Sequence, residues 1–372
     1  MSEPERHARI DRSGLALRPL KERPNKVSIE RDRVLPSDAP GPMSDVALKL
    51  VDETAVRLKR ARAAGKSRML AFGAHTIKNG LAPVIIALIE EGWFTHLATN
   101  GAGIIHDWEF TYQGASSEDV RYGVAHGTFG LWEETGRYLN LALAVGAYSG
   151  KGYGEAVGEM VEREGIQIPS AATLREEIVD GINGNPGHAA AAADLLHTIS
   201  EHGIEDGWLP IEHPYKRYGL QAAAYRLGIP FTGHPMIGHD IIYVHPLNSC
   251  AALGRCAERD FLAFAHGVTR LDGGAYISVG SSVMSPMIFE KSMSMAQNLA
   301  IQEGRRIEGH FIAVVDLAES QWDWKKGEPP VDDPAYYLRY NKTFSRMGGA
   351  MRYAQADNRD FLLALGQALY TT

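Results

Sequence analysis

The stretch Thr95–Glu109 constrains the fold of this chain more than any other part of the sequence. It reads T-H-L-A-T-N-G-A-G-I-I-H-D-W-E, a short apolar run followed by a glycine turn and then by apolar residues at helical spacing. This order predicts a β-strand, a tight turn and the start of an α-helix. In an open parallel sheet such a turn lies at the carboxyl end of a strand, where ligands bind. Gly101 and Gly103 would let the backbone approach a phosphate group, to which the following helix would offer free N–H groups.

Four more short apolar runs have the same form and end in small or polar residues. The sequence predicts these strands at 69–72, 228–232, 275–279 and 310–315. Continuous apolar runs of this length are typical of parallel strands that are covered on both faces. We therefore expect an α/β, Rossmann-like fold with a mostly parallel central sheet flanked by helices. The strand ends would meet at one edge of that sheet and bring together Gly73-Ala74-His75, Thr99-Asn100-Gly101, Gly233-His234, Gly280-Ser281-Ser282 and Asp316.

The chain of 372 residues divides into an arm and one domain. Residues 1–43 are rich in Arg, Lys, Glu and Pro, which predicts an extended arm that is ordered against a neighbouring subunit. Residues 44–372 have the alternating strand and helix patterns of a single α/β domain. Within it, 116–200 is predicted to be mostly helical. Residues 321–340 are rich in Trp, Pro, Asp and Tyr and predict a long functional loop.

Composition excludes several classes of protein. The net charge of −7, with basic residues clustered only near the start, argues against a nucleic-acid-binding surface. No apolar run is long enough to span a bilayer, and the first residues lack the apolar core of a signal peptide. Cys250 and Cys256 are too few for a disulfide framework, and their spacing matches no common zinc motif. A soluble, cytoplasmic protein is expected.

A loop dense in histidine follows the predicted strand at 228–232. His234, His239 and His245 surround Asp240 and invite comparison with a metal site. Their spacings of five and six residues place no pair on one helical face, and no H-E-x-x-H motif is present. We therefore favour an ordered ligand loop without metal, in which His239 and Asp240 are catalytic candidates. A metal- or histidine-dependent lyase or hydrolase that uses this loop is the main alternative.

Other charged residues are candidates for substrate contacts or chemistry. Lys342 lies between aromatic residues, and burial there would make it a reactive amine, whereas a surface lysine is the alternative. Carboxylates near the strand ends would hold a cationic substrate, although acids that start a helix are also often only solvated. The predicted substrate contacts are His75, His106, Asp107, Glu133 and His234.

Five parts of the chain, spread over roughly Met69 to Leu369, resemble deoxyhypusine synthase. They are Gly73–Gly80, Leu97–Gly103, Thr111–Gly114, the pair Ile229–Phe231 and Gly238–Ile242, and Gly274–Val283. In that order, the first two segments are similar to two glycine-containing strand ends of that family, and the third is similar to its Thr-Tyr-Leu-Gly element. The fourth is similar to its Ile-Pro-Val strand with the Gly-Asp loop, and the fifth to a strand that ends in Gly-Gly-Gly-Val. The last glycine trio is Gly-Ser-Ser here, and the family's Trp-Gly-Lys motif is absent.

The resemblance implies an NAD-binding parallel sheet, a homotetramer with sites at subunit interfaces, and transfer of an aminobutyl group from spermidine. In that family NAD takes a hydride from the polyamine, and a lysine then holds the product as an imine. Lys342 fits the position of that lysine when residues are counted back from the last helix. The expected NAD contacts are Thr99, Asn100, Gly101, Gly103, Gly280, Ser281, Ser282 and Asp316.

The leading prediction is a deoxyhypusine synthase-like, NAD-dependent enzyme. It would transfer an aminoalkyl group, or carry out related amine chemistry, on a small polar substrate such as a polyamine. A catalytically silent relative that binds a ligand or acts as a scaffold is a third possibility beside the lyase or hydrolase. Nucleotide retained without turnover would favour the silent relative, and metal in the purified protein would favour the lyase or hydrolase.

Overall fold

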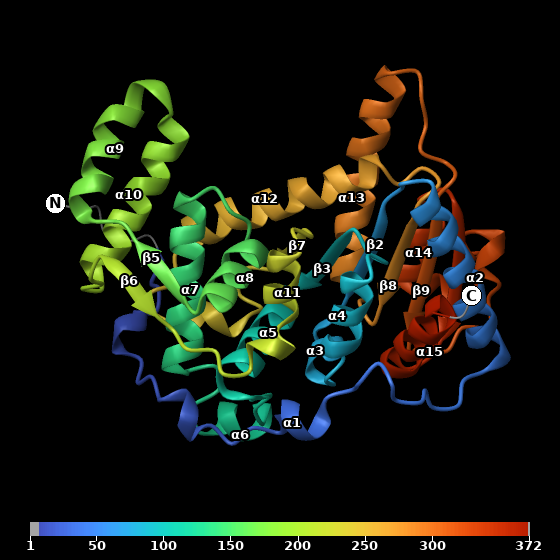
Figure 1. Ribbon diagram of the computed structural model, residues 1–372, viewed down its shortest axis with the longest axis horizontal. Coiled ribbons are helices and arrows are strands. Elements are labelled where there is room, and N and C mark those ends of the chain that lie inside the picture. Colours follow the sequence, from blue (N-terminus) through green and yellow to red (C-terminus); the bar gives the residue numbers. More distant parts are fainter. Residues whose placement is uncertain (1–6, 371–372) are drawn as a thin grey trace.

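The computed structural model describes residues 7–370 and is built around a parallel six-stranded sheet (Figure 1). The sheet order is β10-β9-β8-β2-β3-β7. Read from the other edge, the strands follow the chain order 3-2-1-4-5-6 of the Rossmann fold. The strands are β2 (Arg68–Phe72), β3 (His96–Asn100), β7 (Phe231–His234), β8 (Ala275–Val279), β9 (Phe311–Asp316) and β10 (Ala350–Gln355). The predicted α/β class and parallel central sheet are confirmed.

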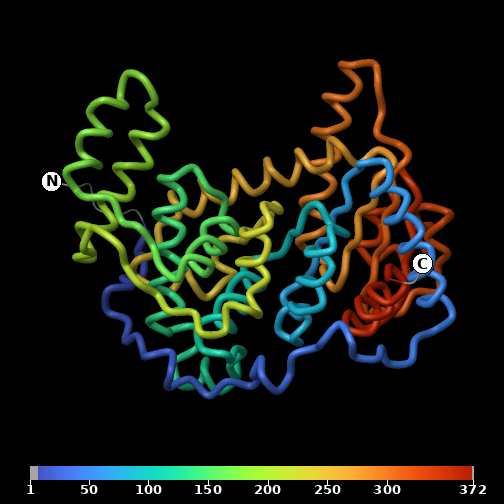
Figure 2. The backbone as a smooth tube through the Cα atoms, in the orientation of Figure 1, coloured from blue at the N-terminus to red at the C-terminus, as the bar shows by residue number. Residues whose placement is uncertain are grey.

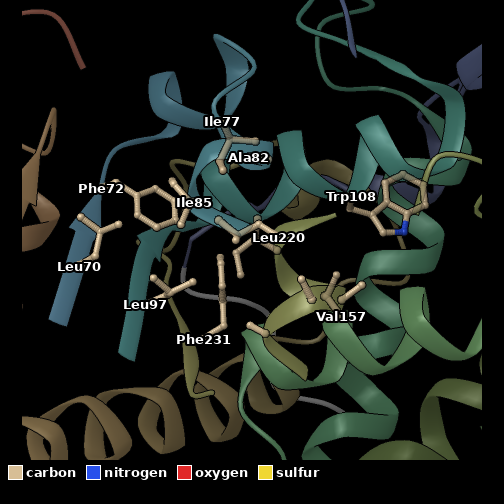
Figure 3. Packing of buried hydrophobic residues seen from close by; sticks show 14 of the residues in the cluster. Leu70, Phe72, Ile77, Ala82, Ile85, Leu97, Trp108, Val157, Leu220 and Phe231 are labelled. Atoms are coloured by element: carbon tan, nitrogen blue, oxygen red, sulfur yellow. The ribbon is translucent and has the colours of Figure 1, made fainter. Parts of the chain in front are cut away.

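Helices cover both faces of this sheet because successive strand residues point to opposite sides. Leu70 and Phe72 pack into one hydrophobic core, together with Leu97 and Ile85 (Figure 3). Met69 and Ala71, which point to the other face of the sheet, pack into a second hydrophobic core. The first core is covered by α2 (Asp45–Ala63), α4 (Ala82–Glu90) and α15 (Asn358–Tyr370), and the second by α12 (Cys250–Thr269), α13 (Met284–Gln302) and α14 (Arg339–Ser345).

A large, mostly helical segment separates β3 from β7 and lies beside the sheet (Figure 1). Its helices are α5 (Gly101–Gln113), α6 (Val120–Ala125), α7 (Glu133–Tyr148), α8 (Tyr153–Arg163), α9 (Ala171–Gly184), α10 (Pro186–Glu201) and α11 (Leu220–Arg226). Its short strands are β4 (Ala115–Ser116), β5 (Gly165–Ile168) and β6 (Gly207–Pro210), the last two paired antiparallel. Helices α9 and α10 form a hairpin that projects from the body (Figure 2).

Two local features differ from the sequence prediction. The apolar stretch 77–90 predicts a single helix, but the structure divides it into α3 (Ala74–Lys78) and α4, because Gly80 has φ +81° and lies against the backbone of Asp32. A methyl group on Gly80 would lie 2.3 Å from the Asp32 carbonyl oxygen. Strand β10 was not predicted, since only Met351 and Ala354 of this edge strand are buried and its apolar signal is weak.

The described part of the arm packs on its own chain, and its predicted contact with a neighbouring subunit stays a prediction. It contains η1 (Arg12–Gly14), η2 (Leu20–Glu22), β1 (Val27–Ser28) and α1 (Ile29–Asp32). β1 pairs with β4, and the Arg12 guanidinium donates to the carbonyl oxygens of Tyr243 and Asn248. Residues 1–6 of the predicted arm lie outside the described residues.

The remaining connections are short 3₁₀ turns and loops. They include η3 (Lys216–Tyr218), η4 (Ile241–Val244), η5 (Trp324–Lys326) and η6 (Pro334–Tyr337). The last two lie in the predicted loop 321–340, which is anchored by the buried side chain of Trp324. No helix in the range 7–370 is both long and apolar enough to cross a bilayer.

Candidate functional site

The predicted meeting of strand ends at one edge of the sheet is confirmed by the register. Asn100 at the end of β3 lies opposite His234 at the end of β7. The order of strands reverses between β2 and β8, and ligands of this fold class bind at such a switch point. Here the turns that follow β2 and β8 touch each other. A methyl group on Gly73 would lie 2.0 Å from the carbonyl oxygen of Gly280, which has φ +58°.

The glycines after β3 are required by two close side chains. Asn100 caps α5 by accepting a hydrogen bond from Gly103 N at 2.9 Å, and Thr99 Oγ1 donates to the Phe72 carbonyl at 2.9 Å. A methyl group on Gly103 would lie 2.2 Å from Thr99 Oγ1. A methyl group on Gly101 would lie 2.1 Å from Asp240 Oδ2. The space above Gly101 is therefore filled by a carboxylate and is not an open cradle for phosphate.

Asp240 lies at the positive end of α5 and has an unusual environment. Burial raises the pKa of its carboxyl to about 6, against the opposing effect of the neighbouring His239. Its Oδ2 atom is buried and has no hydrogen-bond partner among the described residues. A carboxylate held in this way is a functional-site candidate, since native buried polar atoms are usually paired.

A cavity of about 240 Å³ opens beside α5 and contains three of the predicted site residues. His106, His239 and Asp240 all line it. The rest of the lining comes from the arm, from α3 and α5, from the segment that follows β4, and from η4. These are Arg23, Lys78, Ala102, Ile105, Glu109, Ser117, Glu118, Val120, Phe129 and Ile241.

A buried ion pair forms one side of this cavity. The Arg23 guanidinium donates to both carboxylate oxygens of Glu109, at 2.7 and 2.6 Å. Glu109 also accepts hydrogen bonds from Ser116 Oγ at 2.5 Å and from Thr135 Oγ1 at 3.0 Å. Burial alone would raise the pKa of Glu109, but Arg23 and these hydrogen bonds hold it below its ordinary value. Glu109 is therefore ionised at neutral pH.

His106 extends this network into the cavity. Its Nδ1 lies 2.7 Å from Ser116 Oγ, which in turn contacts Glu109. Burial lowers the pKa of His106 to about 4, and the nearby cations Lys78 and Arg23 lower it further against the opposing charge of Glu109. His106 is therefore neutral at pH 7.

Sequence reasoning missed Arg23, Glu109 and Ser116. Glu109 lies three residues after His106 on α5, so a local signal for this pair existed in the helical spacing. Arg23 is 86 residues from Glu109, and no local pattern indicates that contact.

Asp107, expected to contact substrate, is instead a structural cap. It is 1% exposed, and its carboxylate accepts hydrogen bonds from the backbone N–H groups of Leu220 and Gln221 at 2.9 and 3.0 Å. These are the first residues of α11. The carboxylate faces away from the cavity because it holds the start of that helix.

His234 and Glu133, also expected to contact substrate, lie in separate places outside the cavity lining. His234 Nε2 is 2.9 Å from Thr232 Oγ1, and burial lowers its pKa to about 3. Glu133 accepts from His245 Nε2 at 3.3 Å. The three histidines of the loop thus have three different surroundings. In the range 7–370 no group of three or more His, Cys, Asp or Glu side chains is arranged to hold a metal ion.

The remaining predicted residues lie in separate places. Ser281 Oγ accepts from Ser285 N at 3.1 Å, while Ser282 is exposed. Asp316 Oδ1 accepts from Leu317 N at 2.8 Å. The remaining two are His75, exposed on α3, and Lys342 on α14, whose Nζ lies 3.5 Å from the ring centroid of Tyr336. Neither of them lines the cavity.

Comparisons with known proteins give structural likenesses only. No protein-family model matches the sequence, and no curated protein matches it. Among solved structures, AgrE in complex with ornithine and NAD+ is 15% identical, with a TM-score of 0.43, over 88% of this chain and 33% of that chain. ArgZ, an arginine dihydrolase from the ornithine–ammonia cycle in cyanobacteria, is 14% identical, with a TM-score of 0.41, over 87% of this chain and 32% of that one.

A conserved putative LOR/SDH protein from Methanococcus maripaludis S2 is 11% identical, with a TM-score of 0.41. The match covers 90% of this chain and 72% of that protein. The present chain thus spans about a third of the length of AgrE and ArgZ. Deoxyhypusine synthase is not one of these three proteins, so membership of that family stays a prediction.

Proposed function

We propose that this protein is an NAD-dependent enzyme that acts on a small amine. The observation that carries the proposal is the Rossmann strand order, together with a cavity along α5, the helix that follows β3, which is lined by His106 and Asp240. Ligands of this fold class bind outside the carboxyl ends of the strands. Histidine and carboxylate side chains in such a cavity are suited to bind and orient a polar substrate.

The residues at the switch point fit a dinucleotide in part. The Ser282 hydroxyl is exposed, and α13 begins two residues after Ser282. Gly73 and Gly280 instead serve the packing of the turns, because Gly73 lies against the Gly280 carbonyl and Gly280 against the Asn358 side chain. The positive end of α13 and Ser282 would hold the pyrophosphate there. The turn at Gly101 would not, since Asp240 fills it. When bound, the dinucleotide supplies a hydride acceptor, and the cavity residues hold the amine in place.

An aminoalkyl transfer through Lys342, as in deoxyhypusine synthase, receives less support. Lys342 lies on α14, outside the cavity lining, and its ammonium group contacts the ring of Tyr336. Oxidation of the amine, with release of the product, needs no enzyme lysine and is the reaction that we propose.

Calorimetry with NAD and NADH tests the dinucleotide site. The variant Ser282→Asp places a negative charge where the pyrophosphate is proposed to lie, on an exposed side chain that leaves the core intact. We expect the affinity for NAD to fall about tenfold or more, which corresponds to about 1.4 kcal/mol. The control Ser200→Asp makes the same change at an exposed position of α10. Absence of NAD binding by the wild type, or equal binding by both variants, would contradict the proposal.

A further inference from the structure

The hydrogen-bond chain beside the cavity fixes which nitrogen of His106 carries its proton. A serine hydroxyl has one proton, and an ionised carboxylate can only accept. Ser116 donates that proton to Glu109, so its Oγ can only accept from His106. His106 Nδ1 must therefore be the protonated nitrogen of the neutral ring, and Nε2 carries a free lone pair.

No donor among residues 7–370 uses that lone pair. The hydrogen bond that His106 makes there is the contact with Ser116, and it uses Nδ1. Burial and the cations of Lys78 and Arg23 keep the ring neutral, against the attraction of Glu109. Because His106 lines the cavity, Nε2 is an acceptor available to a ligand.

Asp240 is a second acceptor in the lining of the cavity, which also contains the cations of Arg23 and Lys78 and the side chain of His239. No lysine or arginine of the described chain forms an ion pair with Asp240, and His239 is the neighbour that most favours its charged form. The Arg23 guanidinium is already engaged by both oxygens of Glu109. An uncompensated carboxylate away from water costs free energy, and a cationic ligand restores its pairing.

The number of donors that a ligand offers decides between chemical classes. A hydroxyl group has one proton to donate, whereas a primary ammonium group has three and carries the opposite charge to Asp240. The volume of about 240 Å³ lies below the range of drug-sized ligands, so it suits a short aliphatic chain.

We infer that this cavity binds the ammonium group of a short primary amine, with His106 Nε2 and the Asp240 carboxylate as its acceptors. Ser116 and Glu109 are positioning residues, because they set the tautomer of His106, and Arg23 keeps Glu109 ionised. The inference rests on the proposed function in that it names the substrate class of the same site. Binding of the amine does not require the dinucleotide, so the two proposals can fail separately.

The test measures binding and the tautomer, not turnover. Calorimetry at pH 7 uses n-butylamine as the probe, with 1-butanol as the uncharged analogue of the same shape. We expect butylamine to bind at least ten times more tightly than 1-butanol, and Asp240→Asn to abolish most of this preference. The control Asp206→Asn changes an exposed carboxylate elsewhere and leaves the preference intact. Equal affinity for the two probes in the wild type would overturn the inference.

Nitrogen NMR of the histidine rings tests the positioning chain directly. In the wild type, the chemical shifts of His106 should show a protonated Nδ1 and an unprotonated Nε2. Ser116→Ala removes the acceptor at Nδ1, so the Nε2-protonated tautomer should gain population and butylamine binding should weaken about tenfold. Ser292→Ala is the matched control, since Ser292 is buried and its hydroxyl has no partner in the described chain. A tautomer unchanged by Ser116→Ala, with unchanged amine affinity, would overturn the proposed role of Ser116.

Discussion

Arg23 of the arm and Glu109 of α5 form a two-point ion pair that is almost completely buried, with side chains 2% and 1% exposed. The pair joins a segment outside the sheet domain to the helix that borders the candidate cavity. Removal of one partner leaves the other charge buried without compensation.

Glu109→Gln should therefore lower the free energy of unfolding by about 3–5 kcal/mol. Chemical denaturation followed by circular dichroism measures the change. The double variant Arg23→Met/Glu109→Gln should be less destabilised than the sum of the single variants, because it buries no lone charge. Additive losses would show that the two residues do not stabilise each other.

Thr99 and Gly103 should also be coupled, in this case by steric contact. Gly103→Ala places a methyl group 2.2 Å from Thr99 Oγ1, so we expect a destabilised protein. Thr99→Ala removes that oxygen, and the double variant Thr99→Ala/Gly103→Ala should recover part of the loss. Gly184→Ala on α9 serves as the control, since an added methyl group there meets no atom within 4 Å. Failure of the second change to restore stability would show that another contact requires the glycine.

Two buried histidines should make the fold sensitive to acid. Burial lowers the pKa values of His96 and His234 to about 3, below the ordinary 6.5. Between these values the unfolded chain binds more protons than the folded chain, so stability falls as the pH drops below about 6.5. At pH 5 the loss should be about 2 kcal/mol for each histidine.

Unfolding curves recorded from pH 7.5 to pH 4.5 measure this loss. The double variant His96→Gln/His234→Gln should have a flatter stability profile than the wild type, whatever its stability at pH 7.5. His197→Gln changes an exposed histidine of α10 and should leave the profile as it is. Parallel profiles for the wild type and the double variant would contradict the prediction.

An assembly larger than a monomer is predicted, and α13 offers a surface for it. Val283, at its N-cap, with Met287, and Met295 with Leu299 form two exposed apolar pairs, and the members of each pair lie one turn apart on the same face. Light scattering should give a mass well above 40.7 kDa, close to four times that value for a homotetramer. Met295→Glu/Leu299→Glu should reduce the mass. A monomeric wild type would rule the assembly out, and an unchanged mass in the variant would place the interface elsewhere.

The sequence predicted those features of the fold that depend on a single strand and on the turn that directly follows it. The turn after β3 and the joint edge of the sheet follow from short apolar runs that end in small residues, so they were predictable. Asp107 shows why roles were harder to predict than positions. Its carboxylate accepts a hydrogen bond from the backbone N–H of Leu220, which is 113 residues away in the chain.

The hydrogen-bond chain that runs from Arg23 through Glu109 and Ser116 to His106 could not be predicted for the same reason. It depends on a contact between the arm and α5, and the arm has no apolar pattern that indicates where it packs. Lys342 shows how far a local pattern reaches. The sequence placed it among aromatic residues, and its ammonium group lies over the ring of Tyr336, while its catalytic role stays a prediction.

The packing of the arm across α5 has a consequence for the order of folding. Arg23 is synthesised before every residue of the central sheet, yet its partner lies on a helix that follows the second strand of that sheet. Closing this long loop has an entropic cost that is recovered only when α5 is already in place. The wall of the cavity can therefore form only once α5 has formed. A chain in which the arm has not yet docked would lack the Arg23 contact to Glu109 and would have a His106 with no fixed tautomer, so competence to bind would depend on the docking of the arm.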